Sequence, residues 1–329
     1  RWGLIPYANS LDTPGVLCKH LIDGMEVLSC IDGYDDNDST STACIGNSND
    51  SNDNHKHIIY SYLDLLEQKK KKEQANINFL QGINIGIPNE FYVEELPANI
   101  LKTWKDAIKM LNAYGANIVE ISLPTVKRAL PAYYIIALAE AASNLAKYDG
   151  VRYGYRDEND PPDGVYTNTR TIGFGSAVQE RIMMGNLVLG ADSRQLYEHA
   201  SKTRNALVNE FDDVFSNKCD IVLSPTSCNL APRIEDLVKD NYTTNIDPTL
   251  EYTDDVFTIP ASLVGIPSFA IPIYNHDNNS NDSSNLPHSL QVMGPTIVNR
   301  DDDDNYNVGG GIGVKQFKVA LALEKWGSK

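Results

Sequence analysis

The sequence of 329 residues predicts an α/β protein whose central sheet is at least partly parallel. Two short apolar runs, Ile83–Ile87 and Ala116–Ile121, have the pattern of strands, and the segment from Pro97 to Gly115 between them has the pattern of a helix. Strand, helix and strand in this order form the βαβ unit of a parallel sheet. Apolar residues make up 42% of the chain, which is enough for a sizeable core.

The first predicted helix is defined by its two ends and by one apolar face. Pro97 suits a first helical turn because its missing N–H would have no partner there, and Gly115 ends the pattern. The apolar residues between them recur at helical spacing. They are Ile100, Leu101, Trp104, Ile108 and Leu111.

Three further helices and one long loop follow. We expect an Ala-rich helix over Ala129–Tyr148, a second helix over Ser176–Gly190, and a third that Ser193 caps and that runs to about Phe215. The Gly/Pro/Tyr-rich segment Val151–Gly175 is long enough to be a functional or mobile loop. Later strands are expected at Ile221–Pro225, Phe269–Ile273 and His288–Met293, and a last helix at Gly313–Trp326.

Charge and composition exclude several classes of function. The net charge of −16 argues against an extended nucleic-acid-binding face, because phosphate binding needs Lys and Arg. The cysteines lack metal-ligand spacing, so we expect reduced thiols and no structural zinc. They are Cys18, Cys30, Cys44, Cys219 and Cys228. No apolar run is long enough to span a bilayer.

Several polar stretches interrupt the fold pattern. Residues 32–57 are rich in Asp, Asn, Ser and Thr, and such a segment buries too little apolar surface to offset its ordering entropy, so we expect a disordered insertion. Residues 275–285 and 299–307 have the composition of low-complexity loops. Lys69–Lys72 are either a basic docking patch or, as we favour, a solvated turn or helix end.

The stretch Tyr252–Pro267 joins an acidic pair, Asp254 and Asp255, to an apolar run that closes at Gly265. Acids that open a buried helix can place charge at a pocket wall, but they are also common helix N-caps, and spacing alone favours the cap. Arg181 beside apolar neighbours either extends to the surface or faces inward to bind a carboxylate. Tyr133 is either a core aromatic or part of a pocket wall.

Nine short motifs, in order along nearly the whole chain, resemble the amidase signature family, and several resemble the family of A subunits of glutamyl-tRNA(Gln) amidotransferases. The motifs are Ser10–Gly15, Tyr133–Tyr134, Glu140–Leu145, Asp149–Gly154, Gly173–Gly175, Arg181–Gly185, Leu223–Ser227, Asp255–Pro260 and Leu286–Gly294. Each motif alone is weakly specific, whereas their joint order is strong. The resemblance implies a single α/β domain with a mixed central sheet flanked by helices.

The resemblance implies an amidase that hydrolyses glutamine through an acyl-enzyme and releases ammonia. Its nucleophile is a Ser, assisted by a second Ser in a cis peptide and by a Lys, because a hydroxyl needs a base that takes its proton. These residues belong upstream of Arg1, so we expect residues 1–329 to be the C-terminal portion of one amidase domain and to be inactive alone. Ser224, Ser227 and Ser262 do not lie in the nucleophile motif.

The resemblance also assigns the recognition of free glutamine. It implies that Arg181 binds the α-carboxylate, that Asp255 binds the α-ammonium and that Tyr133 lines the pocket, with Asp254 as the alternative acid. Buried charges of this kind are tolerable only when they are paired. No catalytic or metal-binding residue is expected in the chain itself.

The resemblance implies partners as well. They are the B subunit, which uses the ammonia together with ATP and Mg²⁺, a small third subunit as a further possibility, and tRNA held mainly by the B subunit. This chain shows no ATP-binding motif of its own. The low-complexity insertions suit a yeast-like mitochondrial member of the family, so the expected location is the mitochondrial matrix, with the cytoplasm as the alternative. The alternative functions are another amidase with a different substrate, or a truncated non-catalytic binding or scaffold subunit.

Overall fold

The structure is a computed structural model that describes residues 2–31, 35–38, 79–161, 166–232, 254–274, 286–295 and 313–328. The predicted insertion at 32–57 lies outside these residues except for 35–38, and Lys69–Lys72 and the predicted loops 275–285 and 299–307 lie outside them entirely. The described chain forms two compact units. The sheet unit contains Trp2 and the described parts of Gly15–Lys127 and Leu207–Lys329, and the helical unit contains Gly3–Pro14 and the described part of Arg128–Ala206. That these belong to a single domain stays a prediction.

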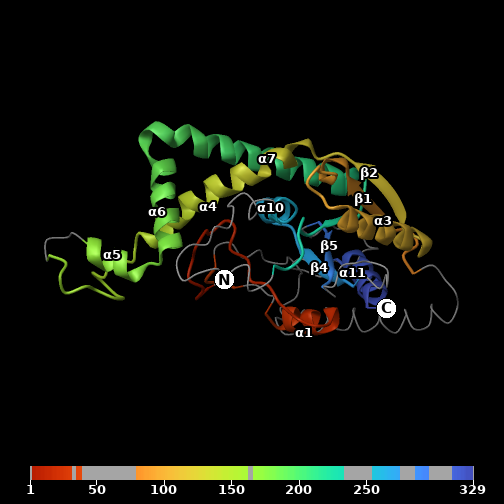
Figure 1. The fold of residues 1–329 in the computed structure, drawn as a ribbon, viewed down its shortest axis with the longest axis horizontal. Coiled ribbons are helices and arrows are strands. Elements are labelled where there is room, and N and C mark those ends of the chain that lie inside the picture. Colours follow the sequence, from red (N-terminus) through yellow and green to blue (C-terminus); the bar gives the residue numbers. More distant parts are fainter. Residues whose placement is uncertain are drawn as a thin grey trace. The chain divides into compact units, whose positions relative to one another are not determined.

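The sheet unit is built on a mixed sheet of five strands in the order β2-β1-β3-β5-β4 (Figure 1). The strands are β1 (Asn84–Pro88), β2 (Asn117–Ile121), β3 (Ile221–Pro225), β4 (Ser268–Ile273) and β5 (His288–Met293). The strand β1 is parallel to β2 and β3, whereas β5 is antiparallel to β3 and β4. The α/β class, the mixed sheet and the parallel pair β1–β2 are therefore confirmed.

Burial along the strands follows from this order. The central strand β3 is buried at all five residues, as expected for an apolar run that has neighbours on both sides. The edge strand β4 alternates, with Ile271 and Ile273 buried and Pro272 exposed. Pro272 cannot donate to a ladder, and an edge strand is where a sheet tolerates it.

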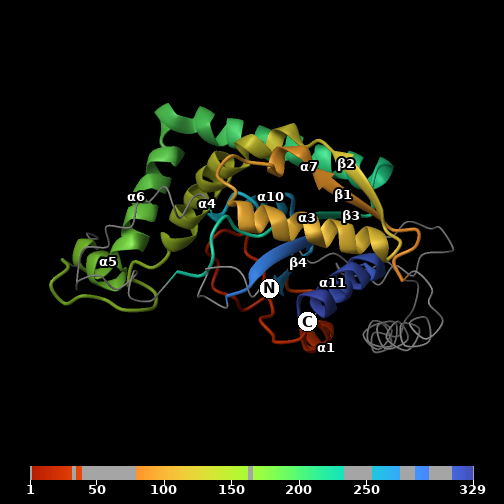
Figure 2. The same ribbon diagram turned by 45° about the vertical axis from the view of Figure 1, so that its right-hand side comes forward.

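Helices α3 (Ala98–Ala113) and α11 (Val314–Gly327) pack against the sheet and against each other (Figure 2). The helix α3 begins one residue later than predicted, with Pro97 as its N-cap residue, and Gly115, with φ of 94°, follows its end as predicted. The buried side chains of α3 include Ile100, Trp104 and Leu111. Both helices were therefore predicted to within about two residues.

Shorter elements complete the sheet unit. They are α1 (Leu21–Ile31), η1 (Asn89–Phe91), η2 (Pro124–Arg128, of which Arg128 belongs to the helical unit), α10 (Ile259–Val264) and the part of α7 (Arg194–Asn217) from Leu207 onward. The sequence pattern did not predict α1. Its first residue, Leu21, donates its backbone N–H to the Glu324 carboxylate of α11, so a distant side chain caps this helix.

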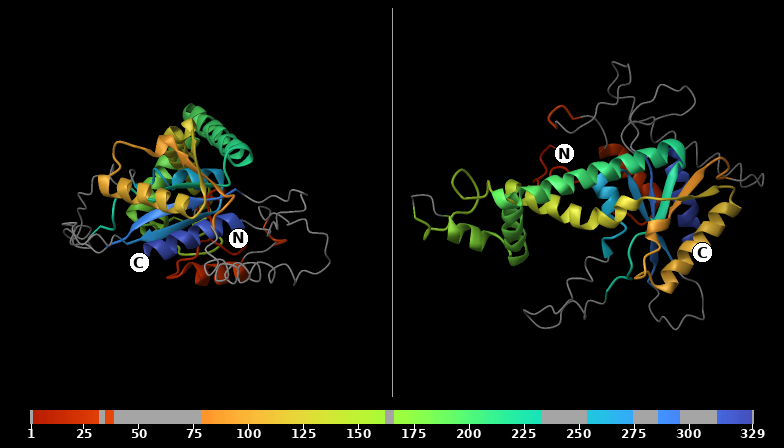
Figure 3. Two further views of the ribbon diagram at one scale, coloured as in Figure 1. Left: turned by 90° about the vertical axis from the view of Figure 1, so that its right-hand side faces the viewer. Right: turned by 90° about the horizontal axis from the view of Figure 1, so that it is seen from above.

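The helical unit contains α4 (Ala129–Leu145), α5 (Thr167–Gly173), α6 (Ser176–Leu189), η3 (Ala191–Ser193) and the first turns of α7. Helices α4 and α6 pack closely (Figure 3). Gly185 permits this approach, because a Cβ atom there would lie 2.0 Å from the Leu138 carbonyl oxygen.

The predicted loop Val151–Gly175 was wrong over α5. Asp160, which is buried, accepts the backbone N–H groups of Asn168 and Thr169 in the first turn of this helix. Arg170 of α5 donates to the carbonyl oxygen of Leu145, the last residue of α4, and to that of Tyr148 just beyond it. Side chains from outside each helix thus satisfy the backbone N–H groups at the start of α5 and a backbone carbonyl at the end of α4.

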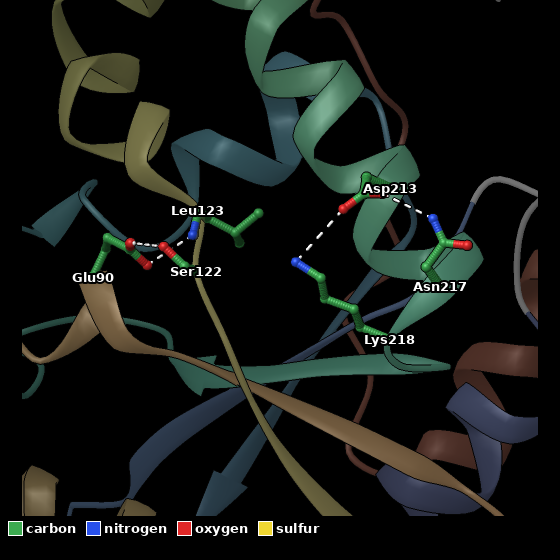
Figure 4. A network of polar contacts seen from close by, with 6 residues as sticks. All are labelled: Glu90, Ser122, Leu123, Asp213, Asn217 and Lys218. Atoms are coloured by element: carbon green, nitrogen blue, oxygen red, sulfur yellow. Dashed lines mark hydrogen bonds and ion pairs between the residues drawn. The ribbon is translucent and has the colours of Figure 1, made fainter.

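Polar side chains fasten element ends in the sheet unit (Figure 4). Glu90, just after β1, accepts the Ser122 hydroxyl at 2.5 Å and the Leu123 N–H at 2.8 Å, just after β2. At the end of α7, Asp213 accepts a hydrogen bond from Asn217 and pairs with Lys218. The Glu90 contacts hold the carboxyl ends of two parallel strands together.

Replacing Glu90 by Gln is expected to reduce the free energy of unfolding at pH 7 by about 1 kcal/mol, because one charged acceptor is lost. Burial raises the pKa of Glu90, but the hydrogen bonds from Leu123 and Ser122 outweigh it and leave the pKa below its ordinary value of 4.5. The contribution is therefore complete above pH 4.5 and is lost as the pH falls through the lower folded-state pKa. Urea unfolding between pH 7 and pH 3 measures this, with the exposed Glu94→Gln as control. A difference between Glu90→Gln and wild type that does not shrink at low pH would contradict it.

Candidate functional site

Arg181 lies on the exposed side of α6 in the helical unit, beside a group of tyrosines. Its Nη1 is 3.4 Å from the Tyr7 hydroxyl oxygen, and its Cζ is 6.0 Å from the centroid of the Tyr7 ring. The Tyr7 phenol is the main cause of a raised Arg181 pKa; partial burial lowers that pKa, and Tyr134 and Tyr133 raise it further. Tyr133 is thus one of the tyrosines that raise the pKa of Arg181, which is a cation throughout the working pH range.

Tyr133 lies on α4, half-buried, and packs edge-to-face on Tyr134 with 5.4 Å between the ring centroids. Edge-to-face geometry aligns the positive edge of one ring with the negative face of the other. Two of the three predicted recognition residues, Arg181 and Tyr133, therefore belong to one tyrosine-rich part of the helical unit.

The Tyr7 segment (residues 7–12) is held by hydrogen bonds on both sides of its backbone. The Asp12 carboxylate accepts the N–H groups of Tyr7 and Ala8 at 2.9 and 3.1 Å. Asn144 of α4 donates its side-chain amide to the Tyr7 carbonyl at 3.0 Å. Both backbone polar groups of Tyr7 are thus occupied, which fixes the point from which its side chain starts.

Ser10 anchors the same segment to two helices. Its N–H and its hydroxyl both donate to the Glu140 carboxylate of α4, at 2.9 and 2.7 Å. The Arg204 guanidinium of α7 donates to the Ser10 hydroxyl at 2.7 Å and to the Ser10 carbonyl at 3.0 Å. Ser10, Glu140 and Asn144 stood in the sequence motifs without an assigned role, and the structure shows that they hold the Tyr7 segment.

Asp255, the third predicted recognition residue, lies half-buried in the sheet unit. Its carbonyl oxygen accepts the N–H groups of Thr258 and Ile259 just before and at the start of α10. The N-cap residue of α10 is Thr258, so the acidic pair does not open this helix and the predicted Asp N-cap is wrong. Asp255 instead begins the turn that leads into the helix.

Asp254 has a clear structural contact. Its Oδ1 lies 2.6 Å from the Ser227 hydroxyl and 2.9 Å from the Asn229 side-chain amide, both in the loop that follows β3. Burial, with smaller contributions from Asp254 and Glu95, raises the pKa of the Cys228 thiol in this loop. Asp254 thus links the loop after β3 to the turn before α10.

The turn and α10 are fixed by buried groups on either side. Phe257 is fully buried and packs edge-to-face on Phe91 at 5.5 Å. After α10, Gly265 adopts a left-handed φ of 80°, the usual way to end a helix. Gln316 of α11 then donates to the carbonyl oxygens of Pro267 and Val292, both at 2.9 Å.

Replacing Gln316 by Met, which has a similar shape, is expected to cost about 1 kcal/mol of stability, because two buried carbonyl groups lose a donor while the buried Gln316 Oε1, which has no partner among the described residues, is removed as well. The Pro267 carbonyl keeps the Gly294 N–H at 3.1 Å, which limits the loss at that carbonyl. Chemical denaturation of the protein that contains this chain measures the change, and Lys325→Met on the same helix is the control. A midpoint equal to that of the wild type would show that Gln316 does not support this turn.

The remaining polar candidates have local partners. Ser224 is buried and donates to the Pro225 carbonyl, and Ser262 donates to the Thr258 carbonyl. Within the described residues no group of three His, Cys, Asp or Glu side chains is placed to hold a metal ion. In the same part of the chain, no helix combines the length and apolar character needed to cross a membrane. The described cysteines Cys18, Cys30, Cys219 and Cys228 are free thiols.

Comparison with known proteins extends over almost the whole chain. The family model described as Amidase matches residues 1–300. The A subunit of the glutamyl-tRNA(Gln) amidotransferase of Maricaulis maris is 37% identical over 327 residues, which cover 99% of this chain and 58% of that protein. The mitochondrial A subunit of the same kind of amidotransferase from Dictyostelium discoideum is 37% identical over 335 residues, covering 93% and 56%.

A solved structure has the same fold. The crystal structure of the glutamyl-tRNA(Gln) amidotransferase A subunit from Thermotoga maritima has a TM-score of 0.61 and 27% identity, and the match covers 99% of this chain and 55% of that one. The present chain therefore spans a little over half the length of the proteins it matches.

Proposed function

The chain belongs to the amidase family, and from that membership we propose that it forms the glutamine-recognising part of the glutaminase subunit of a glutamyl-tRNA(Gln) amidotransferase. The observation that supports this most is the 37% identity over 99% of the chain to a protein named as the A subunit of such an enzyme. The reaction hydrolyses the side-chain amide of glutamine, and the released ammonia converts Glu-tRNA(Gln) to Gln-tRNA(Gln).

Recognition of free glutamine needs one group for each of its two α-charges. Arg181 binds the α-carboxylate, because a guanidinium offers a planar fork of donors that matches a carboxylate. Tyr7 supports this role, since its hydroxyl accepts a hydrogen bond from the Arg181 Nη1, and Tyr133 adds an aromatic wall. The exposed position of Arg181 on α6 leaves its remaining donors available to a ligand.

Asp255 binds the α-ammonium. The neighbouring acid, Asp254, accepts hydrogen bonds from Ser227 and Asn229, so it is engaged in holding the loop after β3. Asp254 therefore has a structural role, and Asp255 is proposed for the ligand because it opens the motif Asp255–Pro260 that resembles the family. The two recognition residues belong to different compact units, and each role is proposed from the surroundings within its own unit.

The ammonia passes to the B subunit, where ATP and Mg²⁺ activate the carboxylate of Glu-tRNA(Gln). No ATP site is proposed for this chain, and tRNA is held mainly by the B subunit, with a small third subunit as a further partner. We place the protein in the mitochondrial matrix, by analogy with the relative from Dictyostelium discoideum that is named as mitochondrial.

The test uses the protein that contains this chain, purified together with its partner, the B subunit. Formation of Gln-tRNA(Gln) from Glu-tRNA(Gln) and ATP is measured with glutamine or with ammonium chloride as the nitrogen source. The wild-type complex uses both sources, whereas Arg181→Met uses ammonium chloride normally and glutamine poorly. A complex that uses ammonium chloride but never glutamine would refute the proposed function.

A further inference from the structure

We propose that Tyr7 is a positioning residue for Arg181, so that the Tyr7 segment determines how well the guanidinium is presented to a carboxylate. This inference rests on the proposed role of Arg181 in glutamine binding. It concerns a residue that the sequence motifs did not include, since the first of them begins at Ser10.

An exposed arginine on a helix has many rotamers, and holding it in one of them before the ligand arrives lowers the entropic cost of binding. Two contacts restrict Arg181 in this way. Its Nη1 donates to the Tyr7 hydroxyl at 3.4 Å, and its Cζ stands 6.0 Å from the Tyr7 ring centroid. The hydrogen bond is longer than the usual range of about 2.7–3.2 Å, and the ring distance is at the limit of about 6 Å for a cation–π contact, so each contact alone is weak.

Weak contacts orient a side chain only if their other partner is itself fixed, and Tyr7 is fixed through its backbone. Asp12 accepts its N–H at 2.9 Å and Asn144 donates to its carbonyl at 3.0 Å. Three residues further on, Ser10 is bound to Glu140 by two hydrogen bonds and to Arg204 by two more. Helices α4 and α7 thus hold the segment from which the Tyr7 ring projects.

Two helices, α6 and α4, together position Arg181 and Tyr7. Helix α6 carries Arg181, and Gly185 on the same helix allows α6 to pack closely on α4. Helix α4 in turn carries Glu140 and Asn144, which hold the Tyr7 segment. Helix α4 therefore positions both the helix that carries the guanidinium and the segment that carries the phenol. The contact between the Tyr7 side chain and Arg181 then joins the two groups.

The test is steady-state glutaminase kinetics of the protein that contains this chain, with Tyr7→Phe and Tyr7→Leu. Glutamine is compared with 4-aminobutanamide, which has the same amide but lacks the α-carboxylate. Tyr7→Leu is expected to raise the KM for glutamine about 10-fold with kcat within about 2-fold, and to leave the KM for 4-aminobutanamide unchanged. Tyr7→Phe keeps the ring and should give a smaller increase. Tyr153→Leu, an exposed tyrosine in the same unit, is the matched control.

A merely structural role would raise both KM values together or lower kcat for both amides, and either result would overturn the inference. So would an unchanged KM for glutamine in Tyr7→Leu. Should Tyr7→Leu fail to fold, Tyr7→Phe decides the question, since its KM for glutamine must rise while its melting curve stays that of the wild type. In an Arg181→Met background neither substitution should have a further effect. If Arg181→Met is itself silent, the proposed function fails; if it raises KM and the Tyr7 variants do not, only the role of Tyr7 fails.

Discussion

Replacing Arg181 with Met is expected to raise the KM for glutamine by about 10- to 100-fold, because hydrogen bonds to a charged partner contribute about 1.5–3 kcal/mol. The value of kcat should change little, since the α-carboxylate is bound equally in the ground state and the transition state. Arg181→Lys should lie between the wild type and Arg181→Met, because it keeps the charge and loses the planar fork. Glutaminase assays of the protein that contains this chain measure both constants.

The matched control is Arg194→Met, which removes an exposed arginine of α7 that pairs with Glu198 in the next turn. Surface pairs of this kind contribute little, so its KM should equal that of the wild type. The interpretation of Arg181 would be wrong if Arg181→Met folded normally and kept the wild-type KM for glutamine.

Replacing Gly185 should have the largest effect on stability. A Cβ at this position would lie 2.0 Å from the Leu138 carbonyl oxygen and 2.6 Å from the Ala142 Cβ, and neither atom can move without moving α4. Gly185→Ala is expected to cost about 1–3 kcal/mol and Gly185→Leu more, because overpacking forces the backbone to shift. Thermal melts monitored by circular dichroism, with hydrogen exchange of α4 and α6, measure the loss.

Gly173→Ala is the control, since a Cβ at Gly173 meets nothing within 4 Å. Its free energy of unfolding should lie within about 0.5 kcal/mol of the wild-type value, as for most surface substitutions. A Gly185→Ala protein that melts like Gly173→Ala would show that α4 and α6 do not pack as closely as described.

Elements with local periodicity could be predicted from the sequence. The strands β1, β2 and β3 are short apolar runs, and α3 has one apolar face between Pro97 and Gly115, so their patterns carry the information. The start of α5 could not be predicted in this way. It depends on Asp160, which lies outside the helix and satisfies its first N–H groups.

The candidate site was predictable only in part, for the same reason. Arg181, Tyr133 and Asp255 stand in motifs that resemble a family, whereas the residues alone favoured a cap for the acidic pair and a core position for Tyr133 and left the role of Arg181 open. The contact between Ser10 and Glu140 joins residues 130 positions apart, and no local pattern encodes it. The hydrogen bonds that Asp254 accepts from Ser227 and Asn229 are further long-range contacts, and no local pattern predicts them.

The most direct test of the central claim is substrate discrimination, measured as kcat/KM for three amides. Glutamine is compared with 4-aminobutanamide, which lacks the α-carboxylate, and with glutaramate, which lacks the α-ammonium. The wild-type protein should prefer glutamine to each by at least about 10-fold. Arg181→Met should abolish only the preference over 4-aminobutanamide, and Asp255→Asn only the preference over glutaramate. Equal use of all three amides by the wild type, or equal losses on all three in both variants, would contradict recognition of free glutamine by these two residues.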